Sequence, residues 1–493
     1  MRDILLGIDF GTTVLKAGVF DRESGRELAR SARRLDVRVT RDGGREQRLA
    51  GIDRTFKEII EEVRRHVGRA WPGLFGIGLA AQGGSTIIAD RDRGRAKTPM
   101  LLWNDGRASA ELARIAERSP RGFWRRFALA DAPPSGLARL AWMADHHPDL
   151  MDDSHIHCGA GEYLFHALTG IWRQDAGNAI QIGSYNARKK KLDAAGFRLI
   201  GVPLSFVAPL RQGHETAPLS ERGAKLLGAK AGIPVAGPYI DQEAGYMAAT
   251  GVSARPLQCS LGTAWVGNFV LPSDTTGTSP TQIVLPSPTN DGRLVVQPLL
   301  AGNVAWDWGL QALMDVDHGR AIEKATAVFR RQLLAPTGLV AFPGCSCPNP
   351  LKPDSIGAGV FHGIDARTTR DDLLRALAAG MVFELRRLLR PVADASAIDS
   401  VVLGGGASKG DHFRKLIAAI HHPLPVHQQV EEDLAVTRGA LYAFDTEAAH
   451  AKTKRLPRLA EGQLVAVREA YEQYLAVFEQ VYGAMPDAAA FAF

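Results

Sequence analysis

The sequence predicts an α/β protein built from two related halves, and three observations lead to that prediction. Short apolar runs typical of strands alternate with longer amphipathic runs typical of helices along the 493 residues. The chain begins with two strand-like runs that flank a glycine turn. The same pattern returns about half a chain later, and such a repeat indicates internal duplication.

The first of these patterns is an N-terminal hairpin, with strands expected at Ile4–Phe10 and Leu15–Asp21 around the turn Gly11-Thr12-Thr13. Backbone N–H groups and hydroxyls at such a tip bind phosphate oxygens, and glycine lets a bulky anion approach. Asp9 ends the first strand, and a carboxylate beside phosphates needs a cation such as Mg²⁺ between them. The segment therefore predicts a nucleotide-phosphate site, although an ordinary hairpin remains its alternative.

The second copy of the pattern is Leu261-Gly262-Thr263, again between two apolar runs. Gly262 follows Gly11 by 251 residues (262 − 11 = 251). Two such hairpins, one in each half, predict a duplicated protein that holds a nucleotide between its halves.

A third element follows at Leu403-Gly404-Gly405-Gly406-Ala407, where a short apolar run leads into glycines. Backbone at glycines can lie flat against a base or ribose. The loop does not fit G-x-G-x-x-G, so its meaning depends on its order after the two hairpins.

Periodicity predicts the remaining elements. In the first half we expect strands at Gly76–Ala81, Ser85–Ala89 and Val235–Ile240, and helices at Ile52–Val67, Ala108–Glu117 and Gly136–His146. In the second half we expect strands at Gln258–Leu261, Ala264–Leu271 and Ser400–Leu403, and helices at Ala321–Gln332, Thr369–Leu389, His412–His421 and Leu464–Tyr482. Residues 272–289 are rich in Gly, Pro, Ser and Thr and predict a long loop or arm.

Composition indicates a soluble enzyme, because 45% of the residues are hydrophobic and 23% are charged. We find no apolar run of about 18 residues and no signal peptide before the first strand, so we expect a cytoplasmic protein. The four cysteines, among them Cys345 and Cys347, are too scattered for a disulfide framework or a zinc site. The net charge is +6, but its basic clusters at 121–126 and 188–191 accompany no nucleic-acid motif, so neither nucleic acid nor membrane is an expected partner.

In the order and spacing of its motifs the chain resembles the FGGY carbohydrate kinases, members of the actin, hexokinase and heat-shock ATPase superfamily. The resemblance runs over nearly the whole length. The matching segments are Asp9–Thr13 with Lys16, Trp103–Arg107, Gly237–Gln242, Leu261–Thr263, Phe342–Gly344 with Gly359–Gly363, Leu403–Ala407 and Thr437–Leu441.

This resemblance implies two ribonuclease-H-like domains of the actin-like ATPase type with an interdomain cleft. We place them at residues 1–247, with the acceptor site, the first hairpin and the catalytic aspartate, and at residues 248–493, with the second hairpin, the adenosine site and the C-terminal helix. It also implies ATP and Mg²⁺ as ligands.

The resemblance implies that Asp241 is the catalytic base, and its place after an apolar strand and at the start of a helical pattern would put it at a strand end facing the cleft. A base of this kind typically contributes a factor of about 10²–10⁴ to the rate. A helix N-cap is the alternative role for an aspartate at this position. Gln242 can hydrogen-bond an acceptor hydroxyl through both ends of its amide, or it can face solvent in the first helical turn.

The resemblance assigns the nucleotide and metal ligands residue by residue. Asp9 is the expected Mg²⁺ ligand, and Lys16 either reaches the phosphates or pairs with a surface carboxylate. Gly302 is an expected nucleotide neighbour, with a purely structural glycine as the alternative. The expected ATP-binding residues are Gly11, Thr12, Thr13, Lys16, Gly262, Thr263, Gly302, Gly405, Gly406 and Ala407.

The predicted acceptor site contains Gln82, Gly83, Trp103, Asn104 and Asp105, together with Asp241 and Gln242. Trp103 would supply a flat apolar face for the C–H side of a sugar, unless it is a buried core residue. Xylulokinases usually have Met-His after the matching glutamine, and glycerol kinases have Arg-Glu, whereas this chain has Gly83-Gly84. Either the pocket is roomier or other loops supply the contacts.

We therefore expect a kinase that transfers phosphate from ATP to a terminal hydroxyl of a small ketose or polyol, with a xylulose-like pentulose as the leading acceptor. Erythritol, ribulose and glycerol are the alternatives within the family. A nucleotide switch of the actin or heat-shock type, or a sugar-binding protein without catalysis, is the alternative outside it. The partner is a small molecule, and the sequence leaves the oligomeric state open, with a homodimer as its candidate.

Overall fold

The computed structural model of the chain describes residues 3–128, 132–262, 264–273, 282–299, 301–314, 318–344, 359–393, 398–431 and 434–483. The predicted α/β class is confirmed. The chain divides into two units. The first contains residues 1–251, 284–294 and 434–451, and the second contains residues 252–283, 295–433 and 452–493. The predicted division at residue 247 stays a prediction.

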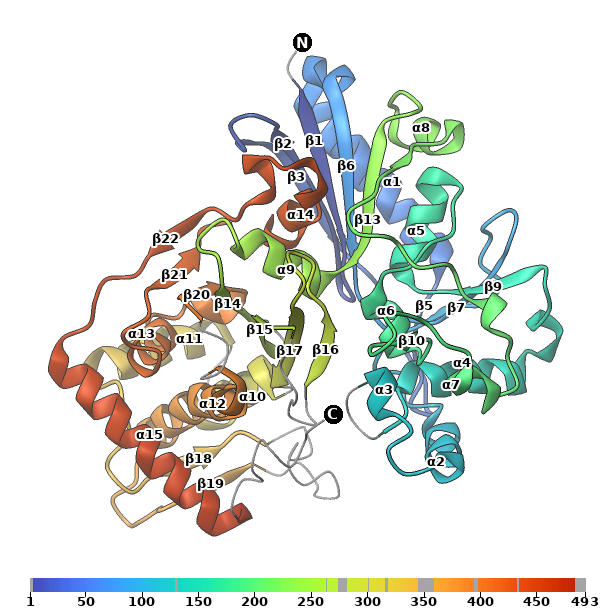
Figure 1. The fold of residues 1–493 in the computed structure, drawn as a ribbon. Helices are drawn as coiled ribbons and strands as arrows, with labels where there is room; N and C mark the ends of the chain where they lie inside the picture. The colour runs from blue at the N-terminus through green and yellow to red at the C-terminus, as the bar shows by residue number, and fades with distance from the viewer. Residues whose placement is uncertain are drawn as a thin grey trace. The chain divides into compact units, whose positions relative to one another are not determined.

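The first unit is built on a six-stranded sheet whose order is β12-β13-β6-β1-β2-β3 (Figure 1). Strand β1 pairs antiparallel with β2 and parallel with β6, and β6 pairs parallel with β13. The carboxyl ends of β1, β6 and β13 therefore meet at one edge of the sheet. The strands are β1 (Ile4–Phe10), β2 (Val14–Asp21), β3 (Glu27–Arg34), β6 (Leu74–Ala81), β12 (Ala217–Pro218) and β13 (Pro234–Ile240).

Smaller sheets and most of the helices complete this unit. The short strands are β4 (Arg38–Val39), β5 (Arg45–Gln47), β7 (Ile87–Asp90), β8 (Met100–Leu101), β9 (His155–Cys158), β10 (Tyr185–Asn186) and β11 (Lys191–Leu192). The helices are α1 (Leu49–Val67), α2 (Ser109–Arg118), α3 (Arg125–Ala128), α4 (Ser135–His146), α5 (Ala160–Thr169), α6 (Ala176–Gln181), α7 (Ala195–Arg198), α8 (Glu221–Leu227), α9 (Asp241–Ala249) and α14 (Ala435–Gly439).

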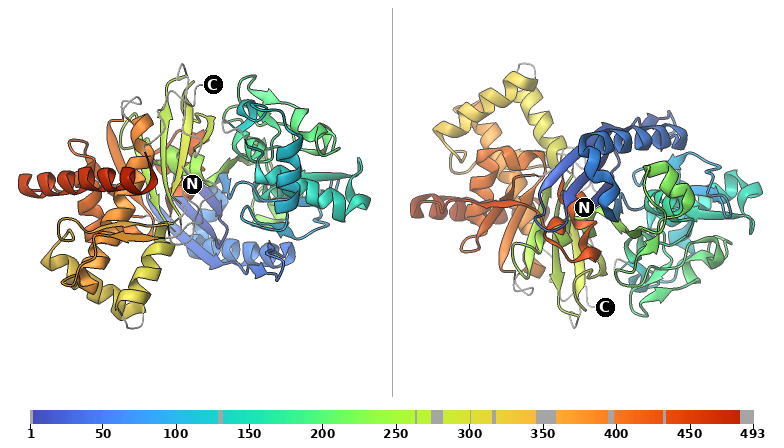
Figure 2. Two further views of the ribbon diagram at one scale, coloured as in Figure 1. Left: turned by 90° about the horizontal axis from the view of Figure 1, so that it is seen from below. Right: turned by 90° about the horizontal axis from the view of Figure 1, so that it is seen from above.

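Helix α1 covers one face of the first sheet, as Figures 1 and 2 show. Its buried residues recur every three or four positions, from Ile52 through Phe56 and Ile59 to Val63, and form one apolar stripe. The stripe packs on alternate residues of β1, such as Ile8. The helix ends at Gly68, after basic residues that complement its C-terminal dipole.

The opposite face of the sheet is covered by the short helix α14, which comes from far along the sequence (Figure 1). The backbone of α14 lies directly against the backbones of β1 and α9, with no side chain between them. A side chain at Gly7 would collide with the carbonyl oxygen of Thr437, and one at Gly439 would collide with that of Ala244 in α9. Helix α14 therefore supports both the central strand and the helix that begins at Asp241.

The second main sheet has seven strands in the order β16-β17-β15-β14-β20-β21-β22. Its strands belong to the second unit, except that residues 284–294, which include most of β16 and the start of β17, are counted with the first. The strands of this sheet and of the unit's small sheet are β14 (Pro256–Leu261), β15 (Trp265–Leu271), β16 (Ile283–Pro286), β17 (Arg293–Leu299), β18 (Val340–Phe342), β19 (Val360–His362), β20 (Ser400–Gly404), β21 (Val426–Gln429) and β22 (Thr453–Arg455). The helices of the second unit are α10 (Gly302–Met314), α11 (His318–Arg331), α12 (Arg370–Ala393), α13 (Asp411–Ile420) and α15 (Glu461–Tyr482).

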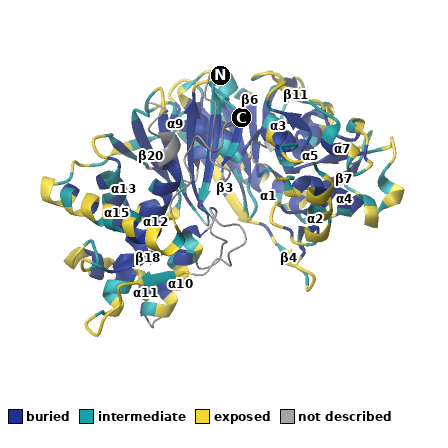
Figure 3. Ribbon diagram, turned by 60° about the horizontal axis from the view of Figure 1, so that its bottom comes forward, coloured by how far each residue is buried: buried dark blue, intermediate teal, exposed yellow. Residues whose placement is uncertain are grey.

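The two main sheets repeat one pattern of pairing. In the second sheet β14 pairs antiparallel with β15 and parallel with β20, and β20 pairs parallel with β21. These are the relations that β1 has with β2 and β6, and that β6 has with β13. Figure 3 shows the central strands of both sheets in the colour of buried residues. The internal duplication predicted from the two hairpins is present in the strand topology.

Most predicted elements are found, and their ends shift by a few residues. Strand β1 has the predicted bounds, and α1 begins at Leu49 rather than at Ile52. Strand β3 and helix α5 were not predicted, because neither shows a clean period of two or 3.6. The predicted arm contains β16, while residues 274–281, Cys345 and Cys347 lie outside the described residues. Among the described helices, none is long and apolar enough to cross a membrane.

Candidate active site

Three strand ends of the first unit bring the predicted catalytic residues together. Asp9 lies one residue before the end of β1, Gln82 directly follows β6, and Asp241 directly follows β13. These three strands are neighbours and run parallel, so their carboxyl ends share one edge of the sheet. Ligands of open α/β sheets bind at this kind of edge.

Asp9 is buried, and its carboxylate is paired with Lys16 on the neighbouring strand. Lys16 Nζ lies 3.2 Å from Asp9 Oδ2. The observed partner of Lys16 is thus the buried carboxylate of Asp9 rather than the surface carboxylate offered as an alternative, and a contact of Lys16 with the phosphates stays a prediction. The lysine therefore holds positive charge beside the predicted metal ligand.

The Asp241 carboxylate is a partly covered acid with a strongly raised pKa. Burial is the main cause, and the negative charge of nearby Asp9 adds to it, so the pKa rises to about 7. A hydrogen bond from Gln242 and the charge of Lys16 act in the opposite direction. A carboxyl group with this pKa both accepts and releases a proton near neutral pH, as a general base must.

The first turn of α9 holds Asp241 in place. The N-cap of the helix is Ile240, whose side chain makes no capping hydrogen bond, and Asp241 is the first helical residue. Asp241 Oδ1 accepts a hydrogen bond from the backbone N–H of Gln242, at 2.9 Å. The side chain therefore stays near the strand end, and the binding of an acceptor hydroxyl by Gln242 stays a prediction.

A chain of hydrogen bonds joins the first hairpin to the predicted acceptor residues. Trp103 Nε1 donates to Thr12 Oγ1 at 3.2 Å, and Thr12 Oγ1 donates to Gln82 Oε1 at 3.0 Å. Gln47 Nε2 fixes the same turn by donating to the Thr12 carbonyl oxygen at 2.9 Å. The one hydroxyl proton of Thr12 is thus directed at Gln82. The tight turn itself is closed by a hydrogen bond from Gly11 N to Val14 O.

The loop after β6 is held from both sides of Gly84. Its N–H donates to Asn178 Oδ1 at 2.8 Å, and its carbonyl oxygen accepts from Arg139 Nη2. Arg139 also donates to the Trp103 carbonyl oxygen at 2.8 Å. Gly84 has φ +73°, the left-handed region that favours glycine. The loop and Trp103 therefore form one fixed wall.

Trp103, Asn104 and Asp105 occupy different environments. Trp103 is 41% exposed, so it is available as a platform rather than buried in the core. Asn104 is exposed as well. Asp105 is buried, and its carboxylate accepts hydrogen bonds from Arg45 N and from the Arg107 guanidinium. A contact of Asp105 with the acceptor stays a prediction, and its observed contacts position the segment that carries Trp103.

A layer of buried acids lies behind this wall. Glu162 accepts from Asn178 Nδ2 at 2.5 Å, and Asp175 Oδ1 accepts from Asn178 N at 2.6 Å as the N-cap of α6. Burial raises the pKa of Glu162 to about 7 and that of Glu243 to about 8. Arg211 provides the positive charge, 3.6 Å from Glu243. These groups fix α6 and α9 from the inside.

The second unit brings its own predicted nucleotide residues together. Gly302 begins α10, and the next residue, Asn303, donates through its backbone N to Gly262 O at 3.4 Å. Trp265 Nε1 donates to Asn303 Oδ1 at 2.9 Å. The second hairpin is therefore attached to the start of α10. Thr263 lies outside the described residues.

The glycine loop joins this cluster. Gly405 has φ +84°, and a side chain there would come within 2.7 Å of the Leu261 backbone. Gly406 is exposed, and a side chain there would meet no atom within 4 Å. Ala407 is partly covered. The loop thus offers an open backbone surface next to the second hairpin, which suits a base or ribose.

The comparisons with known proteins decide the family. The N-terminal domain model of the FGGY family of carbohydrate kinases matches residues 4–248, and the C-terminal domain model matches residues 260–443. The chain belongs to this family. It is therefore a carbohydrate kinase, a two-domain enzyme with the actin-like ATPase fold and ATP as its co-substrate.

Individual relatives of the kinase differ in acceptor. It is 24% identical to a glycerol kinase of Thermus brockianus, over 94% of this chain and 96% of the relative. It is 25% identical to the L-xylulose/3-keto-L-gulonate kinase of Escherichia coli (strain K12), over 88% and 86%. Its fold is that of xylulose kinase from Rhodospirillum rubrum, with a TM-score of 0.85 and 19% identity over 97% of this chain and 99% of that one.

The carboxylates of this kinase fit Mg²⁺ that is completed by phosphates. Magnesium usually binds one or two carboxylates, substrate phosphates and waters rather than a cage made only of protein groups. Asp9 is buried near the end of β1, and its negative charge contributes to the raised pKa of nearby Asp241. Within the described ranges, no group of three or more His, Cys, Asp or Glu side chains forms a complete metal site. Asp9 is thus the residue that would hold the ion.

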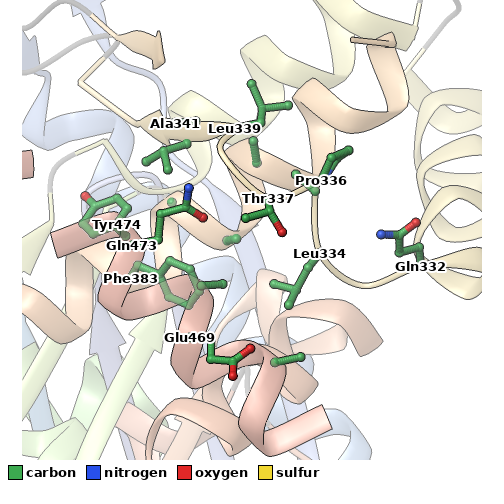
Figure 4. A pocket seen from close by; sticks show the side chains of 17 residues that line it. Gln332, Leu334, Pro336, Thr337, Leu339, Ala341, Phe383, Glu469, Gln473 and Tyr474 are labelled. Carbon is green, nitrogen blue, oxygen red and sulfur yellow. The ribbon is translucent and has the colours of Figure 1, made fainter. Parts of the chain in front are cut away.

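A separate pocket of about 420 Å³ lies in the second unit of the kinase (Figure 4). It is bounded by the segment after α11, by α12 and by α15, with Thr337, Phe383 and Tyr474 among its lining residues. It shares no lining residue with the strand ends described above. No predicted site residue lies in it.

Sequence reasoning missed four residues. Arg139, Asn178 and Gln181 contact the loop after β6 in the first unit, and Asn303 contacts the second hairpin. Asn178 carried a usable signal, because Asp175 three residues earlier is a helix N-cap residue at the start of α6. The others act through contacts that are distant in sequence. Only the folded chain shows Gln181 against the Gly83-Gly84 loop.

Proposed function

We propose that this FGGY kinase transfers the γ-phosphoryl group of ATP, with Mg²⁺, to a terminal hydroxyl of a small ketose or polyol. The meeting of Asp9, Gln82 and Asp241 at the carboxyl edge of three parallel strands is the observation that carries the proposal. A xylulose-like pentulose is the leading acceptor, and erythritol, ribulose and glycerol are its alternatives. Family membership favours this enzyme over a nucleotide switch.

Asp241 accepts the proton of the acceptor hydroxyl as its oxygen attacks the γ-phosphorus. The bond from phosphorus to the β–γ bridging oxygen breaks, and ADP leaves. Bound Mg²⁺ supplies positive charge that offsets the phosphate charges. Asp9 would hold the ion, and Lys16 adds a positive charge next to Asp9.

The acceptor lies between polar groups and one flat ring in this proposal. Trp103 covers the C–H side of the sugar, and Gln242 binds a hydroxyl beside Asp241. Gln82 places Thr12 and Trp103 through the hydrogen-bond chain. The use of both hairpins and of the Gly405–Ala407 loop by one nucleotide stays a prediction, as do the cytoplasmic location and the homodimer.

The test is an ADP-release assay with a panel of acceptors: glycerol, erythritol, D- and L-xylulose, D- and L-ribulose, and gluconate as a sugar acid. We expect at least one ketose or polyol to raise ADP release ten-fold or more above the acceptor-free rate. Product analysis should show phosphate on a terminal oxygen. ATP turnover that no acceptor stimulates would contradict the proposal and favour a nucleotide switch.

A further inference from the structure

Gln181, the last residue of α6, fills the space that side chains at positions 83 and 84 would need. A side chain on Gly83 would collide with Gln181 Nε2, and one on Gly84 would collide with Gln181 Oε1. The amide therefore lies across both glycines. It stands where a longer residue after Gln82 would otherwise present its own polar group.

The backbone of Gln181 is fixed while its amide remains available. Asp175 caps the start of α6, and Gly136 of α4 packs so closely on the Gln181 carbonyl that a side chain there would collide with it. Gln181 is partly exposed, and its amide makes no hydrogen bond with any residue that the structure describes. The fixed backbone thus places an amide without a partner among the described residues beside the Gly83-Gly84 loop, where a ligand can bind it.

The side chains next to the Gly83-Gly84 loop are either apolar or already hydrogen-bonded to backbone carbonyl oxygens. Ile240 and Trp103 flank Gly83 and Gly84. The nearby guanidinium of Arg139 is buried and donates to the carbonyl oxygens of Gly84 and Trp103. The wall thus presents an amide donor, an amide acceptor and apolar surface, which suits a hydroxyl or keto group better than a carboxylate.

We propose that Gln181 binds a hydroxyl or keto group of the acceptor and helps to select a neutral polyol or ketose over a sugar acid. This inference rests on the proposed function, because it assigns a ligand within the same acceptor site. It also explains why Gly83 and Gly84 carry no side chains: the contact comes from α6 instead of from the β6 loop.

The first test is Gln181→Leu, which keeps the approximate volume and removes both hydrogen-bonding groups. One lost neutral hydrogen bond should raise the acceptor KM by about 3- to 10-fold, while kcat and the KM for ATP change less than two-fold. Gln212→Leu, at an exposed position in the same unit, is the matched control and should change none of them. Gln181→Glu is the second variant and should also raise the KM for the neutral acceptor.

Gly83→Ala provides an independent test through the same amide. The new methyl group would push the flexible Gln181 side chain aside, so the acceptor KM should rise as in Gln181→Leu. In the double variant Gly83→Ala/Gln181→Leu the two effects should not add. Thermal melting of each variant separates this effect from unfolding.

The outcomes distinguish the inference from the proposed function. If the wild-type enzyme phosphorylates a polyol and both Gln181 variants keep its KM within two-fold, the inference is wrong and the proposed function stands. Equal rises in the KM for acceptor and ATP would also overturn it. A wild-type enzyme that accepts nothing in the panel would overturn the proposed function, and this inference with it.

Discussion

The two units share one strand order but differ in the chemistry at the ends of their strands. In the first unit Asp9 lies two residues before Gly11 and faces Lys16 across the hairpin. In the second unit Ser260 lies two residues before Gly262 and faces Val266. The first hairpin thus carries an ion pair where the second carries no charge.

The same contrast recurs at the third parallel strand of each sheet. Strand β13 leads directly into Asp241, whereas β21 leads into Val430. Strand β20, next to β21, ends in glycines that expose backbone. The comparison shows that one strand order carries two different sets of groups, charged ones in the first unit and glycine backbone in the second. In the proposed function the charged groups serve proton transfer and metal binding, and the glycine backbone serves nucleoside binding.

The largest expected effect comes from removing the carboxylate of the first unit. Asp241→Ala should lower kcat for acceptor phosphorylation by a factor of at least about 10², because the hydroxyl loses its base. The ADP-release assay with the best acceptor measures this loss. Turnover near the wild-type rate would reject the assignment of the base.

The second expected effect concerns the glycine loop of the second unit. Gly406→Ala should raise the KM for ATP by about 3- to 10-fold and leave the melting temperature unchanged, because its methyl group meets no protein atom. Gly405→Ala is the comparison variant. It should lower the melting temperature, since its methyl group would meet the Leu261 backbone at a positive φ. An unchanged KM for ATP in Gly406→Ala would contradict the adenosine assignment.

A third prediction concerns pH and Lys16. Asp241 must be ionised to act as a base, so kcat/KM should rise as the pH increases through about 7. The charge of Lys16 lowers the pKa of Asp241, so Lys16→Met should move the midpoint of this rise to higher pH. Lys230→Met, at an exposed position in the same unit, should leave the midpoint in place. A midpoint that moves to lower pH would show that Lys16 acts otherwise.

The smallest expected effect is on stability. The pKa of Asp241 rises from its usual value of 3.8 to about 7 in the folded protein. Its contribution to stability is therefore complete below pH 3.8 and is lost as the pH rises through about 7. Asp241→Asn has no such loss. Its melting temperature relative to wild type should therefore increase between pH 5 and pH 8.5. A difference that does not change with pH would indicate that Asp241 is well solvated.

The sequence predicted the scaffold well where periodicity and repetition were strong. The duplicated hairpins, β1, β13 and α1 follow from local patterns and from the spacing of Gly11 and Gly262. The family resemblance then placed Asp9 and Asp241, and the fold brings their strand ends to one edge. Such residues are predictable because each follows directly from a recognisable strand.

The contacts around the acceptor were not predictable in the same way. The clamp on Gly84 comes from Asn178 and Arg139, which are 94 and 55 residues away in the sequence. The position of Gln181 depends on the packing of α4 against α6. Tertiary packing determines these contacts: the N-cap Asp175 signals the start of α6 locally, but not the contact of Asn178 with Gly84.

Equilibrium ATP binding to Asp241→Ala and to Gly406→Ala tests the division of labour between the units most directly. We predict that Asp241→Ala binds ATP within about two-fold of the wild-type Kd although it no longer phosphorylates the acceptor, and that Gly406→Ala binds ATP about 3- to 10-fold more weakly while its acceptor KM is unchanged. If Asp241→Ala instead lost ATP binding in proportion to its activity, the separation of proton transfer from nucleoside binding would be contradicted.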